Sequence, residues 1–219
     1  MTLEVPKPMV LVAGRPFLDY ELRLLKKNGF RDFVICVGYR ADQIERYFGD
    51  GSRIGISIIY SNDGEKQLGP SGALTNAASL LDEEFMVTYG DAFLRMDYKR
   101  FDEKFRSCGK LGMMAVLENH NRFGKSDIVV RDGLVVRYDK INQPPDMNWI
   151  NFGATMLKKR ALDEVPNSRE LGEEQFYQAL IAKRELAAFE TTDRFYEIGT
   201  LSSLNEFEEF ISENPKLLI

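Results

Sequence analysis

The stretch Phe33-Val34-Ile35-Cys36-Val37-Gly38-Tyr39 sets the fold class of this chain. It is a short, continuous apolar run that ends at a glycine, which is typical of a strand buried on both faces of a sheet. A helix is predicted on each side of it, because apolar residues recur at helical spacing in residues 16–28 and again in residues 41–48. Pro16 suits a first helical position and Gly29 suits the position just past a helix end.

The alternation of strand and helix continues along the chain. Strands are predicted at residues 55–60, 85–89 and 111–117, and helices at residues 71–81 and 98–108. Asp97 can cap the second of these helices, and Gly109 can end it. This alternation predicts an α/β fold with a doubly wound, mostly parallel sheet.

The pattern changes after residue 120 to short alternating strands around Asp132-Gly133, which is a strong hairpin signal. We therefore expect one domain over residues 1–219, in which residues 120–150 form a small β-rich insertion. The later part of the chain predicts a strand at 149–157, a helix at 172–184, a strand at 195–198 and a final helix. Ser203 and Glu206 suit a capping box at the start of that last helix.

The composition limits the classes of function. A net charge of −5 without a run of five or more Lys and Arg argues against binding to nucleic acid or to an anionic membrane surface. No apolar stretch is long enough to span a membrane. Two cysteines make a poor disulfide framework, so we expect a cytoplasmic protein. A single histidine, His120, leaves little room for histidine-based zinc or triad chemistry.

Polar residues follow three of the predicted apolar runs, where ligands bind in doubly wound sheets. The three segments are Tyr89-Gly90-Asp91, Gln67-Leu68-Gly69-Pro70-Ser71-Gly72 and Tyr196-Glu197-Ile198-Gly199-Thr200. If their strands are neighbours, Asp91 and Glu197 could share Mg²⁺, which prefers oxygen ligands and phosphate partners. Taken singly, each carboxylate is as well explained as a helix cap or a surface charge.

The order of these segments resembles that of the nucleoside-diphosphate-sugar pyrophosphorylases, the sugar-1-phosphate nucleotidyltransferase family, over residues 2–210. The resemblance rests on separate segments of the sequence, which are Pro6-Lys7-Pro8-Met9-Val10, Gly49-Asp50-Gly51-Ser52-Arg53, Leu68-Gly69-Pro70-Ser71-Gly72-Ala73-Leu74, Tyr89-Gly90-Asp91, Tyr138-Asp139-Lys140, Asn151-Phe152-Gly153 and Tyr196-Glu197-Ile198-Gly199-Thr200. It implies a Rossmann-like sheet of the nucleotide-diphospho-sugar transferase type.

The resemblance also implies a reaction, in which a sugar-1-phosphate oxygen attacks the α-phosphate of a nucleoside triphosphate and releases pyrophosphate. By this resemblance Lys7 and Asp91 are catalytic, and Asp91 and Glu197 hold Mg²⁺. The implied nucleotide-binding residues are Gly69, Pro70, Ser71, Gly72 and Gly90, and the implied sugar-phosphate-binding residues are Lys140, Asn151 and Gly153. The base, the sugar and the formation of a homo-oligomer stay open.

The sequence departs from the family pattern in two places. The family's Gly-Gly-x-Gly-Thr-Arg loop and the strand before it are absent ahead of Pro6, so we expect a longer natural protein and two strands that lack a neighbour. Glu197 stands where the family usually has Asp. Two alternatives follow: a catalytically impaired homologue that binds a sugar nucleotide or partners an active subunit, and a nucleotide-sugar-dependent glycosyltransferase. Such glycosyltransferases usually carry Asp-x-Asp after a strand. This sequence does not, since Asp91 is followed by Ala92-Phe93.

Overall fold

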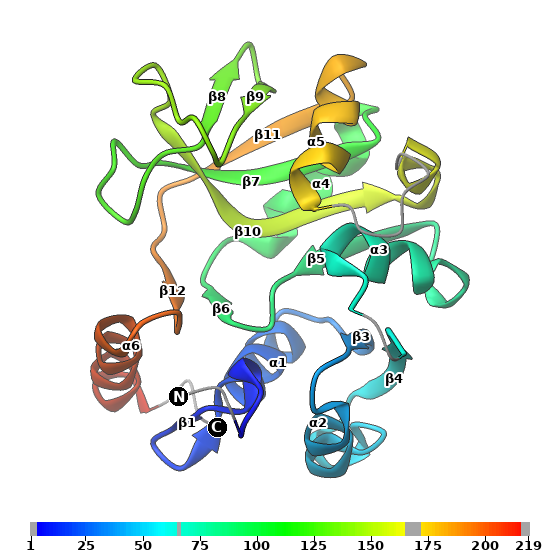
Figure 1. The fold of residues 1–219 in the computed structure, drawn as a ribbon, viewed down its shortest axis with the longest axis vertical. Coiled ribbons are helices and arrows are strands. Elements are labelled where there is room, and N and C mark those ends of the chain that lie inside the picture. Colours follow the sequence, from blue (N-terminus) through cyan, green and yellow to red (C-terminus); the bar gives the residue numbers. More distant parts are fainter. Residues whose placement is uncertain (1–3, 65–66, 165–171, 216–219) are drawn as a thin grey trace. The chain divides into compact units, whose positions relative to one another are not determined.

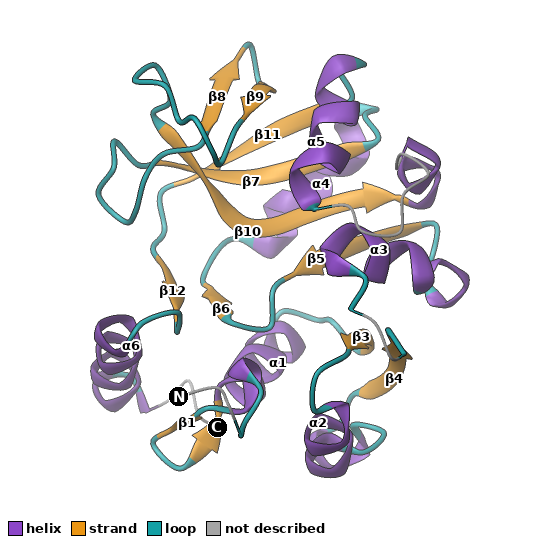
Figure 2. Cartoon of the chain, in the orientation of Figure 1, coloured by secondary structure: helices purple, strands orange, loops and turns teal. Residues whose placement is uncertain are grey.

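A computed structural model describes residues 4–64, 67–164 and 172–215 of the chain. Helices and strands alternate along most of it (Figures 1 and 2). The chain forms two compact units. Unit 1 contains Met1–Glu65, Tyr89–Arg95 and Arg194–Ile219, and unit 2 contains Lys66–Thr88 and Met96–Asp193. The single domain over residues 1–219 stays a prediction.

Unit 1 contains a parallel strand pair with two helices. Its elements are α1 (Phe17–Lys27), β3 (Asp32–Val37), α2 (Ala41–Phe48), the 3-10 turn η2 (Ser52–Ile54) and β4 (Ser57–Asn62). The strands β3 and β4 run parallel from the pair Asp32 and Ser57 to the pair Val37 and Asn62. Leu22 of α1 and Phe48 of α2 are buried in the same apolar cluster as Val37. The helices predicted on both sides of the run 33–37 are therefore confirmed.

The remainder of unit 1 surrounds an aromatic cluster. It consists of η1 (Lys7–Met9), β1 (Leu11–Val12), β2 (Arg15–Pro16), β6 (Ala92–Leu94), β12 (Phe195–Glu197) and α6 (Leu201–Glu213). The ring of Phe207 on α6 lies 4.7 Å from that of Phe17 and 5.1 Å from that of Phe93, centroid to centroid. Aromatic pairs at such distances add to the stability that burial provides. This cluster joins α6 to α1 and β6.

Unit 2 is built on a six-stranded sheet. Its strands are β5 (Glu84–Thr88), β7 (Gly112–Glu118), β8 (Ile128–Arg131), β9 (Leu134–Tyr138), β10 (Trp149–Lys158) and β11 (Leu186–Thr191). They lie in the order β5-β10-β7-β11-β9-β8, and β8 also pairs with β10. Only the β7–β11 pair in this sheet is parallel. The extra pairing closes the β8–β9 hairpin against the middle of the sheet.

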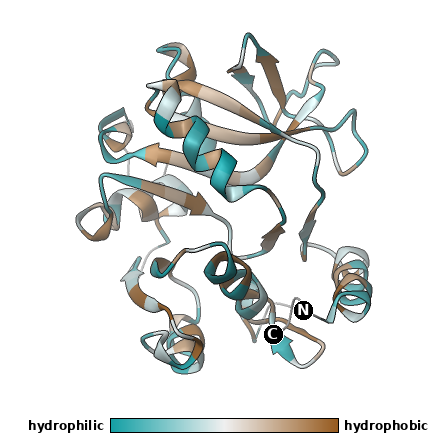
Figure 3. Ribbon diagram, turned by 180° about the vertical axis from the view of Figure 1, so that it is seen from behind, coloured by the Kyte–Doolittle hydropathy of each residue, from teal (hydrophilic) through white to brown (hydrophobic). Residues whose placement is uncertain are grey.

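Helices cover both faces of this sheet. They are α3 (Gly69–Asn76), η3 (Ala78–Leu80), α4 (Tyr98–Cys108), η4 (Lys159–Glu164) and α5 (Glu173–Ala182). In Figure 1, α5 lies in front of the sheet and α4 behind it. Phe101 and Phe105 of α4 are buried, and Figure 3 shows the polar face of this helix turned away from the sheet. On the other face, Phe176 and Leu180 of α5 join the core of the sheet.

Several local predictions are confirmed. Asp97 caps α4, because its side chain accepts a hydrogen bond of 2.9 Å from the Arg100 amide, and Gly109 ends the helix with a φ of 69°. Asp132 and Gly133 both have positive φ, as the predicted tight hairpin between β8 and β9 requires. The predicted residues of the α6 capping box were wrong. The box is formed by Thr200 and Ser203 and not by Ser203 and Glu206.

The balance of strand directions differs from the predicted mostly parallel sheet. Among the described residues only β3–β4 and β7–β11 pair in parallel, and the other pairs are antiparallel. The reason lies in residues 120–158, where β8, β9 and β10 follow one another without an intervening helix. Strands joined in this way run antiparallel, because a parallel connection needs a crossover. The predicted β-rich insertion is therefore part of the main sheet of unit 2.

Several strands are paired on one side only within the described residues, and β5 and β3 are two of them. In unit 2, β5 pairs with β10, and each of its five residues is half-buried although Phe85, Met86 and Val87 are apolar. In unit 1, β3 pairs with β4 alone.

Candidate functional site

In unit 1, the structure brings Lys7 and Asp91 together although they are 84 residues apart. Lys7 is the first residue of η1, which begins after Pro6, and its ammonium donates to Asp91 Oδ2. Gly90 lies against Pro8, because a Cβ atom at Gly90 would come within 3.3 Å of Pro8 Cγ. The glycine thus lets the Lys7 segment approach the chain at Asp91.

Glu197 lies beside this pair. It is the last residue of β12, which runs antiparallel to β6 and places Glu197 opposite Ala92. The amide of Ile198 donates to the carbonyl oxygen of Asp91 at 3.3 Å. The two predicted metal carboxylates therefore belong to adjacent strand ends, as the magnesium prediction requires. Their proximity depends on β6, which follows Asp91 and was not predicted, rather than on the strand that precedes Asp91.

The donor set fits an ion that also binds phosphate. Within residues 4–64, 67–164 and 172–215, no group of three or more His, Cys, Asp or Glu side chains could hold a metal. Two carboxylates suit Mg²⁺, which is usually held by one or two carboxylates together with substrate phosphates and water. In this structure the Asp91 carboxylate is paired with Lys7, and the Glu197 carboxylate accepts a hydrogen bond from the Gly199 amide.

The predicted nucleotide segment lies in unit 2, at the start of α3. Gly69 has a φ of 70°, which a residue with a side chain rarely adopts, and Pro70 follows it in the first turn. Ser71 is buried, and its hydroxyl donates to the Gly172 carbonyl oxygen at 3.0 Å. Ser71 thus ties α3 to the residue that precedes α5. Gly72 lies one residue further along the helix, and Gly90 belongs to unit 1.

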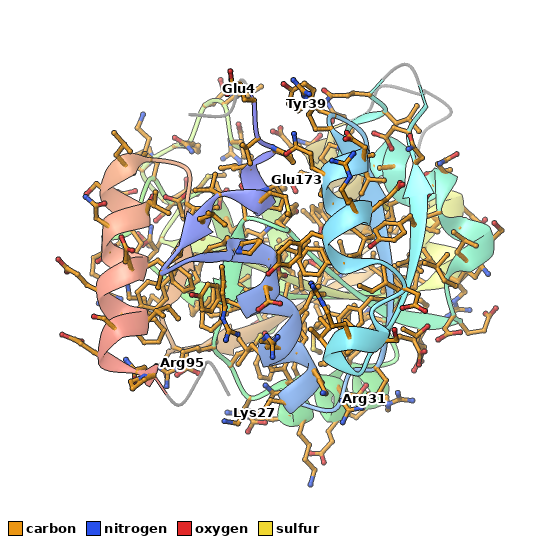
Figure 4. The ribbon with its side chains drawn as sticks, turned by 90° about the horizontal axis from the view of Figure 1, so that it is seen from below. Glu4, Lys27, Arg31, Tyr39, Arg95 and Glu173 are labelled. Carbon is orange, nitrogen blue, oxygen red and sulfur yellow. The ribbon has the colours of Figure 1, made fainter. Side chains whose placement is uncertain are left out.

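The predicted sugar-phosphate residues lie together in unit 2 around Glu173, the first residue of α5 (labelled in Figure 4). The Lys140 ammonium donates to Glu173 Oε1, and the Tyr138 hydroxyl donates to the same oxygen at 2.8 Å. Asn151 Oδ1 accepts from the Gly153 amide at 2.9 Å, where β10 changes register and Gly153 has a φ of 104°. Glu173 was not predicted as a site residue, because an acidic residue in the first turn of a helix is common and needs no functional explanation.

A buried carboxyl group, Asp127, completes this cluster. The residue is 5% exposed, and its Oδ1 accepts from the Asn151 amide at 3.3 Å. Burial raises the pKa of Asp127 to about 6, against the opposing effect of the hydrogen bond from Asn151 and of the Lys140 charge. Burial, together with the neighbouring Glu173 carboxylate, also raises the pKa of Tyr138 far above its ordinary value, so Tyr138 is a hydrogen-bond donor at neutral pH. No pattern in the sequence marks Asp127.

A separate hollow of about 460 Å³ in unit 2 contains none of the predicted site residues. Its lining includes Lys183 and Glu164, which form an ion pair, and Glu185, whose carboxylate accepts from the Leu111 amide at 3.0 Å. These charges are used in structural contacts. The two clusters around Asp91 and around Glu173 are therefore the stronger candidates for chemistry.

The sequence profile of the family described as "Nucleotidyl transferase" matches residues 1–214. A mannose-1-phosphate guanylyltransferase from Mycobacterium tuberculosis is 30% identical over 207 residues, which cover 91% of this chain and 57% of the relative. A D-glycero-alpha-D-manno-heptose 1-phosphate guanylyltransferase from Campylobacter jejuni is 27% identical over 197 residues, covering 90% of this chain and 86% of the relative. The chain thus spans little more than half the length of the mycobacterial relative.

A solved structure shows the same fold. The crystal structure of HddC from Yersinia pseudotuberculosis has a TM-score of 0.79 and 25% sequence identity, and the match covers 96% of this chain and 92% of that chain. The same protein complexed with GMP-PN matches with a TM-score of 0.77. The predicted α/β fold class is confirmed by this likeness. No helix in the described part of the chain is long and apolar enough to cross a membrane.

Proposed function

Because the chain belongs to the nucleotidyl transferase family, we propose that it transfers a nucleoside monophosphate from a nucleoside triphosphate to a sugar 1-phosphate. An oxygen of the sugar 1-phosphate attacks the α-phosphorus, and the bond from that phosphorus to the bridging oxygen of the β-phosphate breaks. Pyrophosphate leaves with the electron pair, and a nucleoside diphosphate sugar is formed. This reaction depends mainly on positioning and on neutralisation of charge.

The observation that carries the proposal is the convergence of Lys7, Asp91 and Glu197 in unit 1. A lysine and two carboxylates at adjacent strand ends supply one cation and two metal ligands for a triphosphate. In the proposed reaction Asp91 and Glu197 would hold Mg²⁺, which supplies positive charge to the triphosphate. Lys7 would exchange its contact with Asp91 for a phosphate oxygen. The close approach at Gly90 supports this arrangement, since it keeps the Lys7 segment beside Asp91.

On the sugar side, we assign the phosphate to Lys140 and the sugar ring to Asn151 and the turn at Gly153. The hydrogen bond from the Gly153 amide fixes the side chain of Asn151, and Asp127 fixes its backbone amide. Both contacts reduce the freedom of Asn151 before a ligand arrives, which favours binding. The base is assigned to the segment Gly69–Gly72. A cytoplasmic location also belongs to this proposal, because two cysteines make a poor disulfide framework.

The experiment is pyrophosphate release with Mg²⁺, a panel of nucleoside triphosphates beginning with GTP, and mannose and heptose 1-phosphates. We expect turnover that Asp91→Ala lowers about a hundredfold or more, because a group that stabilises transition-state charge has that typical effect. Asp42→Ala is the matched control, since Asp42 is an exposed aspartate on α2 of the same unit. Binding of both substrates without turnover would favour the impaired homologue, and equal activity of Asp91→Ala and wild type would refute the assignment.

A further inference from the structure

Glu173 occupies an unusual position for a carboxylate. Its side chain is only 13% exposed, and its Oε1 atom accepts hydrogen bonds from both the Tyr138 hydroxyl and the Lys140 ammonium. The side chain of Lys140 is 47% exposed, and its Nζ lies 5.6 Å from the centroid of the Tyr138 ring. The only lysine predicted to bind the sugar phosphate is therefore turned towards α5 and bonded to an internal anion.

The charges around Lys140 are unfavourable for a phosphate. Glu174, next to Glu173, accepts from the Lys140 backbone amide at 3.4 Å. Asp127 is close enough for its titration to depend on both Lys140 and Glu173. Asp139, the preceding residue, caps the following loop and lies 3.8 Å from the Arg137 guanidinium. A dianionic phosphate that approached Lys140 would thus be repelled by the carboxylate that already holds the ammonium.

Two contacts would still stabilise the Glu173 carboxylate if the Lys140 ammonium moved away. Tyr138 is 1% exposed and stays a donor, so its hydroxyl continues to bond the carboxylate when the ammonium moves away. Glu173 is in the first turn of α5, where the helix dipole stabilises a negative charge. These two contacts lower the cost of a buried carboxylate whose ion pair is broken.

We propose that Glu173 is the internal counter-ion of Lys140, which a sugar phosphate displaces on binding, and that this exchange sets the affinity of unit 2 for the phosphate group. The inference rests on the proposed function, because it deepens the role assigned to Lys140. Glu173 is thus a specificity-determining residue. It takes the place of the ligand's anion in the free protein and disfavours weakly charged competitors that cannot displace it.

The test is anion binding to the full chain, measured by calorimetry with inorganic phosphate and with mannose 1-phosphate as separate probes. Glu173→Gln keeps an acceptor for the Tyr138 hydroxyl but removes the charge. We expect it to bind both anions about two- to fivefold more tightly than wild type, the range typical of a partly exposed ion pair. Glu174→Gln is the matched control, since it removes a neighbouring charge that is not paired with the ammonium, and its effect should be smaller.

Two further variants link the effect to Lys140 and Tyr138. In a Lys140→Gln background, Glu173→Gln should no longer tighten binding, because there is no ammonium to release. Tyr138→Phe should weaken anion binding, because Glu173 loses the donor that holds it when the ammonium leaves. Tyr138→Phe also tests the inference independently if Glu173→Gln does not fold.

The outcomes separate this inference from the proposed function. Tighter binding of inorganic phosphate by Glu173→Gln without any binding of sugar 1-phosphates would support the counter-ion role and count against the proposed substrate. Unchanged or weaker binding of both anions by Glu173→Gln would overturn the counter-ion role. An equal gain in the Lys140→Gln background would also overturn it, since the effect would then be a general change of charge.

Discussion

Replacement of Asp127 by Asn should stabilise unit 2 at neutral and alkaline pH. The carboxyl group is 5% exposed and lies at the start of β8, where its own amide donates to the Trp149 carbonyl oxygen at 3.0 Å. Asparagine has almost the same shape, and its Oδ1 can still accept from the Asn151 amide. The substitution therefore removes the cost of burying a charge without opening a cavity.

The magnitude follows from the raised pKa. The pKa of Asp127 rises from 3.8 to about 6 on folding. One pKa unit corresponds to about 1.4 kcal/mol, so the ionised group destabilises the folded state by about 3 kcal/mol at pH 8. The folded state binds this proton more tightly than the unfolded state, so stability from this group is lost as pH rises from about 4 to about 6. Below about pH 4 the carboxyl group is neutral in both states and the cost disappears.

The assay is urea unfolding followed by the fluorescence of Trp149, the single tryptophan, which lies in unit 2. At pH 8, Asp127→Asn should unfold at higher urea than wild type, by a free energy of up to about 3 kcal/mol. At pH 4 the two proteins should unfold at nearly the same urea concentration. A variant that is less stable than wild type at pH 8, or a difference that does not change with pH, would refute the reasoning.

Two further predictions concern a strained glycine and a helix cap in unit 2. Gly153→Ala should destabilise the unit by about 1–2 kcal/mol, because a φ of 104° is strained for a residue with a Cβ atom; an unchanged urea midpoint would contradict the strained register change in β10. Asp97→Ala should cost about 1 kcal/mol, because α4 loses its cap, whereas Asp102→Ala within the same helix should cost less. Equal losses of unfolding free energy in the two aspartate variants, measured by urea unfolding with Trp149 fluorescence, would contradict the capping role of Asp97.

The sequence predicted best those elements whose cause is local. The cap at Asp97 and the turn at Asp132-Gly133 depend on a few neighbouring residues, and both are found in the structure. Strand β11 was missed although it lies in the middle of the six-stranded sheet. Its residues Leu186–Thr191 include Ala187 and Ala188, which have low strand propensity. Their strand conformation depends on pairing with β7 and β9, and that information is not local.

Some residues of the candidate site could be recognised from the sequence, and others could not. Lys7, Asp91 and Glu197 each lie in a recognisable segment, but the adjacency of Asp91 and Glu197 depends on the pairing of β6 with β12, and β6 was not predicted. Asp127 and Glu173 could not be recognised, because neither stands in a marked pattern and each gains its role through burial. Tyr138 and Glu173 are 35 residues apart, and only the packing of α5 on β9 brings them into contact. Contacts of this kind can be identified only once the tertiary structure is known.

The most direct test of the proposed function is ³¹P NMR of the full chain incubated with GTP, mannose 1-phosphate and Mg²⁺, repeated with the other nucleoside triphosphates and with heptose 1-phosphate. We expect signals of a nucleoside diphosphate sugar and of pyrophosphate to grow in equal amounts. Asp91→Ala should abolish both signals, and Asp42→Ala should preserve them. Binding of both substrates with unchanged phosphorus spectra over the whole panel would contradict the proposed function.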